Sequence, residues 1–211
     1  MPKIIDLSHP IEPEMPLYPG TEPPVIKEVC SIRKDGFKES LFSFNSHTGT
    51  HLDAPAHIFQ IGKSVELFDC NKFFGPAIII DCSSKSSIDL FTAKNACSNL
   101  KKQDFILFHT GWSKYWGNDR YYKDFPVLTN DAAKYISSLT IKGIGIDAVS
   151  FDAAGDNNLT NHKIFLEKEI ILVENLCCLN MAPRDNFYFS CLPLKITGAD
   201  GAPTSAFAII T

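Results

Sequence analysis

The sequence lacks the features that mark several classes of protein. No apolar run approaches the ~20 residues that a membrane-spanning helix needs. The formal net charge of −4 comes with no long basic run, so we expect neither a membrane span nor a nucleic-acid partner. The N-terminal segment MPKIIDLSHP also lacks the basic-then-apolar profile of a signal peptide. These absences predict a cytoplasmic protein.

Several well-known catalytic signatures are also missing. The chain contains no H-E-x-x-H, Gly-x-Ser-x-Gly, P-loop or G-x-G-x-x-G sequence. Its seven cysteines are an odd number and include no C-x-x-C pair, which favours reduced, mostly buried thiols over a disulfide framework. The common zinc-helix, serine-nucleophile and dinucleotide-binding classes are therefore not indicated.

What is present is the composition of an ordinary globular protein. Hydrophobic residues make up 45% of the chain and charged residues 21%. No repeat, low-complexity tract or long Pro/Gly/Ser linker separates two parts. We therefore expect residues 1–211 to form a single domain with one large core.

The order of sequence patterns predicts the fold class. Prolines cluster between residues 10 and 24, which predicts a loop. Alternating segments on either side of a turn at 34–37 predict a hairpin within 25–46. Farther along, strands and helices alternate. The predicted strands lie at 77–81, 105–110, 143–149, 170–173 and 206–211, and the helices run from a cap at 86–89 to Leu100, from a cap at 129–131 to Leu139, and over 162–169. We expect an α/β fold with a mixed β-sheet and flanking helices.

One short segment carries the strongest chemical signal. Three of the six histidines lie within His47-Thr-Gly-Thr-His51-Leu-Asp53-Ala-Pro-Ala-His57. If this segment is extended, His47, His51 and Asp53 project to the same side, and Gly49 leaves room between the imidazoles. Two imidazoles and a carboxylate suit Zn²⁺, Mn²⁺ or Fe²⁺. An isolated histidine is usually a surface or core residue, but this cluster favours metal binding.

The same segment resembles the signature H-x-G-T-H-x-D-x-P-x-H of the cyclase family of metal-dependent hydrolases, which includes bacterial kynurenine formamidases and isatin hydrolases. The resemblance extends through IDLSHPI and MPLYPG upstream, and through HTGW, GIDAVSFD and GADGAP downstream. It thus covers nearly the whole chain and implies the swivelling β/β/α fold of that family.

The resemblance also implies residue roles. His47, His51 and Asp53 would bind a first divalent metal ion and His162 a second, with Asp53 and Glu174 bridging the two. One or two ions would be bound, Zn²⁺ ahead of Mn²⁺. His57 would be the general acid/base, since imidazole titrates near neutral pH.

These roles lead to three hypotheses about function. The first is hydrolysis of a small amide of the arylformamidase type, N-formylkynurenine to kynurenine plus formate, by metal-activated water. The second is a ring-opening hydrolase of cyclic amides, imides or lactones, as in isatin hydrolases. The third, of another class, is a metal-binding protein without catalysis. His57 argues against the third, because a binding-only site does not need a histidine that is not a ligand.

Two positions depart from the family pattern and bear on the substrate. Tyr18 lies where kynurenine formamidases usually have a tryptophan that stacks on the aromatic substrate, and the alternative is that its ring packs the proline loop. Ser205 lies where the family often has arginine. The resemblance further suggests a homodimer or higher homo-oligomer. The loop around Tyr18 and the aromatic segment 112–116 are the surfaces expected to form the contact, unless they pack within the chain.

Overall fold

A mixed β-sheet of nine strands forms the centre of the molecule in the computed structural model, which describes residues 1–97 and 103–211. The strand order is β1-β11-β9-β5-β6-β7-β8-β4-β10. The four central strands β5 to β8 are parallel, and all the strands outside them pair antiparallel. The strands are β1 (Lys3–Asp6), β4 (His51–Asp53), β5 (Phe74–Asp81), β6 (Phe105–His109), β7 (Gly143–Ile146), β8 (Ile171–Glu174), β9 (Phe187–Ser190), β10 (Gly201–Pro203) and β11 (Phe207–Ile210).

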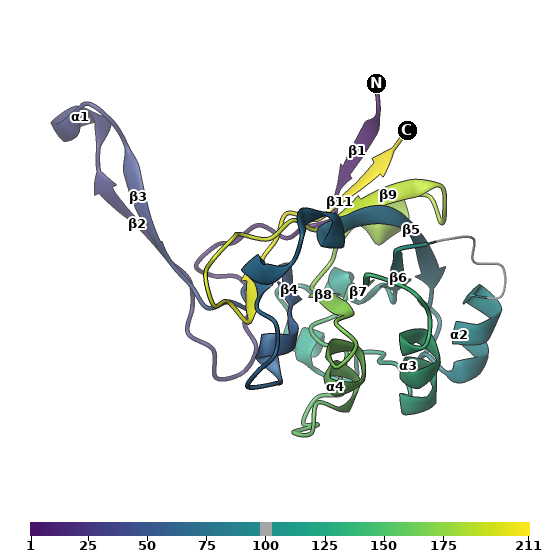
Figure 1. Cartoon of the computed structure of the whole chain (residues 1–211). Coiled ribbons are helices and arrows are strands. Elements are labelled where there is room, and N and C mark those ends of the chain that lie inside the picture. The colour runs from purple at the N-terminus through teal and green to yellow at the C-terminus, as the bar shows by residue number, and fades with distance from the viewer. Residues whose placement is uncertain (98–102) are drawn as a thin grey trace.

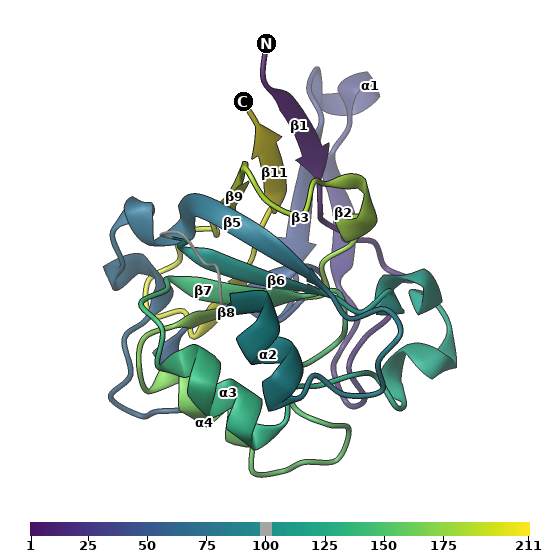
Figure 2. The same cartoon turned by 90° about the vertical axis from the view of Figure 1, so that its right-hand side faces the viewer.

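Three helices cover one face of this sheet (Figures 1 and 2). They are α2 (Leu90–Cys97), α3 (Asn130–Ser137) and α4 (Thr160–Leu166). Apolar side chains of β5, β6 and β7 pack against them in one buried cluster, and a second cluster lies on the opposite face. Short 3-10 helices connect the strands: η1 (Pro55–His57), η2 (Val65–Leu67), η3 (Cys70–Phe73), η4 (Trp112–Tyr115), η5 (Asp119–Tyr122) and η6 (Leu179–Met181).

A separate two-stranded arm projects away from the body (Figure 1). It consists of β2 (Val25–Cys30), the short helix α1 (Ile32–Asp35) and β3 (Glu39–Ser43). Large apolar side chains on it are exposed, including Ile26, Phe37, Leu41 and Phe42. An isolated two-stranded hairpin is only marginally stable in water, so an arm that extends from the body with exposed apolar side chains is unusual.

The structure confirms the α/β fold with a mixed sheet and flanking helices. Two helix caps are also as predicted: the Thr129 hydroxyl accepts from the backbone N–H of Ala132, and the Asp89 carboxylate accepts from that of Thr92. Helix α2 is described as far as Cys97, and the rest of the predicted helix to Leu100 lies outside the described residues.

Several predicted elements have different boundaries: helix α3, for example, ends at Ser137 rather than Leu139, and β5 begins at Phe74 rather than at residue 77. The strand predicted for 143–149 ends at Ile146, because the buried carboxylate of Asp147 accepts the backbone N–H groups of Thr110 and Gly111 and draws the chain out of the ladder. The helix predicted for 162–169 instead spans Thr160–Leu166. Among the described residues, no helix has the length and apolar character needed to cross a membrane.

Candidate metal centre

The sheet itself brings distant parts of the sequence together at one site. Strand β4 lies between β8 and β10, and the register places His51 opposite Glu174 and Asp53 opposite Gly201. Helix α4 follows the loop that leaves β7 and contributes His162. The histidine segment thus meets residues more than a hundred positions later in the chain.

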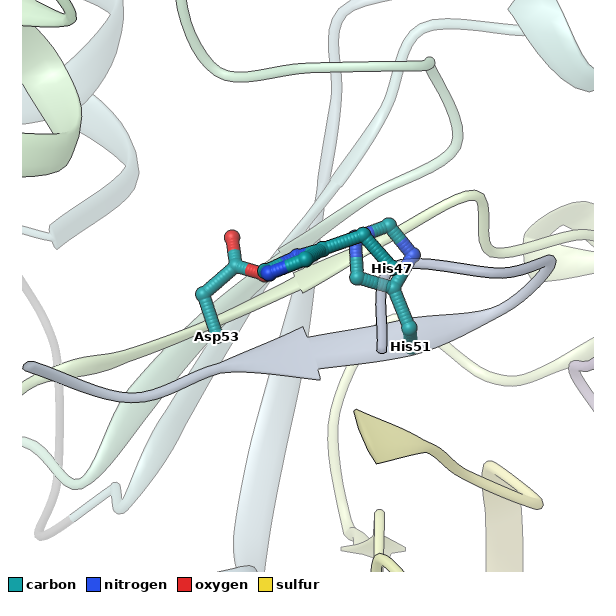
Figure 3. A group of neighbouring side chains, drawn as sticks. All are labelled: His47, His51 and Asp53. Carbon is teal, nitrogen blue, oxygen red and sulfur yellow. The ribbon is translucent and has the colours of Figure 1, made fainter. Parts of the chain in front are cut away.

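The prediction of an extended chain from residue 47 to 53 is wrong in its first half. The chain makes a turn at residues 46–47 and a bend at 49–50, where Gly49 has φ +64, and only His51–Asp53 is a strand. Gly49 therefore provides a left-handed turn residue. A Cβ there would contact Ile11 and Met15 rather than an imidazole. The rings still converge, with the His47 and His51 centroids 5.0 Å apart and nearly perpendicular (Figure 3).

The Asp53 carboxylate is the centre of the site. It is 1% exposed, and neither of its oxygens makes a hydrogen bond of acceptable geometry. Its Oδ1 nevertheless lies 2.7 Å from His47 Nδ1, toward which it points in Figure 3, and 3.4 Å from His51 Nε2. Its Oδ2 lies 3.4 Å from His162 Nε2. Burying a carboxylate is costly without compensation, and a divalent cation among these nitrogens would supply it.

Glu174 completes the arrangement from the neighbouring strand. Its Oε2 lies 3.5 Å from His51 Nε2 and its Oε1 3.3 Å from His162 Nε2. The backbone N–H of Phe151 donates to Oε1 and holds the carboxylate in place. Asp53 and Glu174 therefore each direct one oxygen toward His51 and the other toward His162. This is the placement expected of carboxylates that bridge two cations.

The two carboxylates attract positive charge to the site. Burial by itself lowers the pKa of His47, but the charge of Asp53 and the hydrogen bond to Asp200 outweigh it and raise that pKa to about 9. The same opposition applies to His51, where burial lowers the pKa and the contacts with Asp53 and Glu174 raise it to about 10. A site that favours protonated imidazoles in this way is one that favours a cation.

Hydrogen bonds outside the centre orient two of the rings. His51 Nδ1 is 2.8 Å from the carbonyl oxygen of Gly49, and His162 Nδ1 is 2.6 Å from Asp152 Oδ2. Asp152 also accepts the backbone N–H groups of Asn161 and His162. Both rings therefore present Nε2 to Asp53 and Glu174, as metal-ligating histidines do when an outer acceptor fixes their tautomer. The sequence assigns no role to Asp152, although the segment GIDAVSFD contains it.

His57 lies beside this group rather than inside it. It closes η1, and its ring centroid is 4.1 Å from that of His47 and 5.9 Å from that of His162. Its Nδ1 is 3.2 Å from Asp200 Oδ2, and the same oxygen is 2.8 Å from His47 Nε2. Asp200 is a second carboxylate to which the sequence assigns no role, although the segment GADGAP contains it.

An aromatic pocket of about 630 Å³ opens above the site. Tyr18 lies on its wall and is 53% exposed, so its ring is available to a ligand. Trp116, which also lines the pocket, stacks on His9 with ring centroids 3.8 Å apart. Trp112 donates its indole N–H to the carbonyl of Tyr121. The segment 112–116 therefore makes contacts within the chain, the alternative that the sequence had left open.

Known proteins resemble this chain in sequence and in structure. The Cyclase family model matches residues 5–153. A kynurenine formamidase of Bacillus cytotoxicus is 32% identical over 204 residues, covering 96% of this chain and 95% of that protein. Isatin hydrolase A from Labrenzia aggregata has a similar structure at 26% identity and a TM-score of 0.89, covering 100% of this chain and 94% of that one. A structure described as a potential metal-dependent hydrolase with cyclase activity is 28% identical with a TM-score of 0.80, covering 100% and 99%. The chain belongs to the cyclase family and has its fold.

Proposed function

We propose that this protein is a metal-dependent hydrolase of a small amide, of the arylformamidase type, that converts N-formylkynurenine to kynurenine and formate. The observation that carries the proposal is the pair of buried carboxylates, Asp53 and Glu174, each placed between two imidazoles. Support for the substrate comes from the similarity to a kynurenine formamidase along nearly the whole of both chains.

The metal-binding part of the proposal rests on the donor set. His47, His51 and Asp53 form one group whose ligand atoms lie close together, and Asp53, His162 and Glu174 form another. Since Asp53 belongs to both, we propose one or two divalent ions per chain, Zn²⁺ ahead of Mn²⁺. Such an ion, when bound, lowers the pKa of a water molecule and polarises the substrate carbonyl.

The remaining steps fall to residues of the chain. His57 is close to the metal-binding imidazoles yet outside both carboxylate groups, so it can accept a proton from the attacking water and pass one to the leaving amine. Tyr18 and Trp116 offer aromatic faces to an aryl substrate. Stacking on them would hold the formamide over the centre.

A ring-opening hydrolase of cyclic amides, imides or lactones is the second candidate. It is favoured by the TM-score of 0.89 to isatin hydrolase A. A metal-binding protein without catalysis is the third, and the position of His57 beside the imidazoles argues against it.

A kinetic comparison distinguishes these candidates. Purified protein supplied with Zn²⁺ or Mn²⁺ is assayed on N-formylkynurenine, isatin and a dihydropyrimidine imide, with chelator-treated protein as the control. We expect metal-dependent turnover with N-formylkynurenine as the best substrate. If isatin is best, the second candidate replaces the first. A metal-loaded protein inactive on a broad amide, ester and lactone panel would favour the third.

The proposal also includes the wider setting of the enzyme. Residues 1–211 form one hydrolase domain that works in the cytoplasm, where its seven free cysteines stay reduced. It acts as a homodimer or larger homo-oligomer. The exposed apolar side chains of the arm support self-association better than the 112–116 segment does, because that segment packs within the chain.

A further inference from the structure

Asp200 lies between His47, a proposed metal ligand, and His57, the proposed acid/base. It directly precedes β10, and its carbonyl oxygen accepts the backbone N–H of Ala54 just past β4. One side-chain oxygen, Oδ2, contacts both His47 Nε2 at 2.8 Å and His57 Nδ1 at 3.2 Å. A carboxylate oxygen only accepts hydrogen bonds, so both of these ring nitrogens must carry a proton.

The two protons have separate consequences. If a metal ion replaces the proton on Nδ1, the atom that faces Asp53 Oδ1 at 2.7 Å, His47 keeps its proton on Nε2 and can offer the electron pair of Nδ1 to that ion. With its proton on Nδ1, His57 keeps an unshared electron pair on Nε2, the nitrogen that does not contact Asp200. One oxygen thus selects the tautomer of both rings.

Asp200 can also be considered as a metal ligand, because its carboxylate forms a compact group with His47 and His57. Two observations indicate instead that Asp200 orients the two rings from outside the set of metal ligands. The side chain of Asp200 is 39% exposed, whereas that of Asp53 is 1% exposed. The contacts of Asp200 with the two rings have hydrogen-bond geometry, whereas neither oxygen of Asp53 makes such a bond.

The residue after Asp200 fits the same interpretation. A Cβ on Gly201 would lie 2.8 Å from His47 Cε1 and 2.7 Å from the carbonyl oxygen of Leu52. The absence of a side chain therefore lets the His47 ring lie against β10 while Asp200 holds its Nε2. The backbone and the carboxylate fix the same imidazole from two directions.

We propose that Asp200 is a positioning residue shared by the metal centre and the proton-transfer group: it fixes His47 for metal binding through Nδ1 and His57 for proton transfer through Nε2. This inference rests on the proposed function for the roles of the two histidines. It adds that both roles depend on one carboxylate that touches neither metal nor substrate.

The first test measures metal affinity by competition between the protein and a chromogenic chelator for Zn²⁺. Asp200→Ala should still bind Zn²⁺ at saturation but with roughly 10–100-fold lower affinity, the usual cost of losing an outer partner of a ligand. Asp200→Asn should largely restore the affinity, because the amide oxygen can still accept from both rings. The same order is expected for kcat.

Glu66→Ala is the matched control. The Glu66 carboxylate accepts the backbone N–H of Gly198 and so holds the same loop without touching an imidazole. It should leave the Zn²⁺ affinity unchanged. Equal effects of Glu66→Ala and Asp200→Ala would mean that only the loop matters and would overturn the proposal. Complete loss of Zn²⁺ binding in Asp200→Ala would show that Asp200 is itself a metal ligand. An unchanged Zn²⁺ affinity in Asp200→Ala would show that Asp200 does not position His47.

The second test needs no variant and no substrate. Nitrogen-15 NMR of the wild-type Zn²⁺ protein, which has six histidines, reports the tautomer of each ring. We expect His57 to be protonated on Nδ1 and His47 on Nε2, and a His57 proton on Nε2 would overturn the inference even if Asp200→Ala does not fold. If the tautomers and affinities are as expected but no amide is hydrolysed, the hydrolase proposal fails and the role of Asp200 stands.

Discussion

At the scale of single residues, the histidines of the site differ in which neighbours surround them. His51 and His162 face both buried carboxylates, whereas His57 contacts only Asp200 among the acidic side chains near it. This difference separates the proposed ligands from the proposed acid/base more clearly than the sequence does, because the signature segment contains both His51 and His57.

A pair of substitutions tests that separation. His57→Ala should retain metal while kcat falls ~10²–10⁴-fold, the usual contribution of a general acid/base. Asp53→Ala should lose both metal and activity, since its two oxygens face three imidazoles. Elemental analysis and steady-state kinetics measure the two effects. If His57→Ala emerged without metal, His57 would be a ligand and the assignment of the base would be wrong.

Tyr18 permits a prediction about substrate binding. Its ring lies on the pocket wall between prolines that restrict the loop, so stacking on it costs little conformational entropy. Tyr18→Ala should raise KM for an aryl formamide more than it lowers kcat, because this contact is equal in ground and transition states. Tyr18→Trp should preserve turnover of N-formylkynurenine. An unchanged KM in Tyr18→Ala would show that the ring only packs the loop.

Some residues of the site can be predicted from the sequence and others cannot. His47, His51, Asp53 and His57 lie within eleven positions, so their spacing alone indicates a site. Asp152 and Asp200 are isolated acidic residues in the sequence, and only the fold places them against imidazoles. No spacing rule connects an outer carboxylate to its ring, which explains why their roles were not predicted.

At the scale of elements, long apolar segments were predictable and short ones were not. Strands β5 and β6 each contain a run of four buried apolar residues, AIII in β5 and FILF in β6. Strand β10 is Gly-Ala-Pro, which has no strand propensity, and it is extended because β4 pairs with it. The turn before β4 was missed because alternation of residue types does not reveal the left-handed conformation of Gly49.

Strand β10 itself can be tested through Gly201. In Gly201→Ala, the new methyl group meets the backbone of Leu52, which cannot yield, and the ring of His47, which must move. We expect lower thermal stability together with weaker Zn²⁺ binding. Gly75→Ala is the control, since Gly75 lies in β5 and its new methyl group crowds the side chain of Asp104, which is outside the donor set of the site. It should reduce stability alone. Normal Zn²⁺ affinity in Gly201→Ala would show that the His47 ring does not depend on this glycine.

At the scale of the whole molecule, the proposed metal centre would join two distant regions of the chain. The proposed ligands come from β4 and from the α4–β8 region, and they meet only in the folded chain. Metal binding should therefore stabilise the folded state, by about 2.7 kcal/mol at a hundredfold excess of metal over Kd. Removal by chelator should lower Tm by roughly 5–10 °C for a chain of this size. Calorimetry with and without Zn²⁺ measures this. Identical melting curves would contradict metal binding at this site.

The arm provides the test of assembly. Ile26 and Phe42 form a cross-strand pair, are 42% and 60% exposed, and should lie in the contact between copies. The double variant Ile26→Ser/Phe42→Ser should shift the protein toward monomer in light scattering, while Ile61→Ser, which removes an apolar side chain 98% exposed outside the arm, should not. A wild-type protein that is monomeric at all usable concentrations would reject the oligomer.

The position of β4 between β8 and β10 also sets the order in which the protein can mature during synthesis. The histidine segment leaves the ribosome early, but its strand gains one neighbour only after residue 174 and the other only after residue 203. Most of the chain must therefore be made before the ligands assemble. A nascent chain arrested before β8 should bind Zn²⁺ weakly, and release of the complete chain should bring a sharp gain in affinity and in resistance to protease. We therefore expect loading with metal to be a late event in the life of this protein.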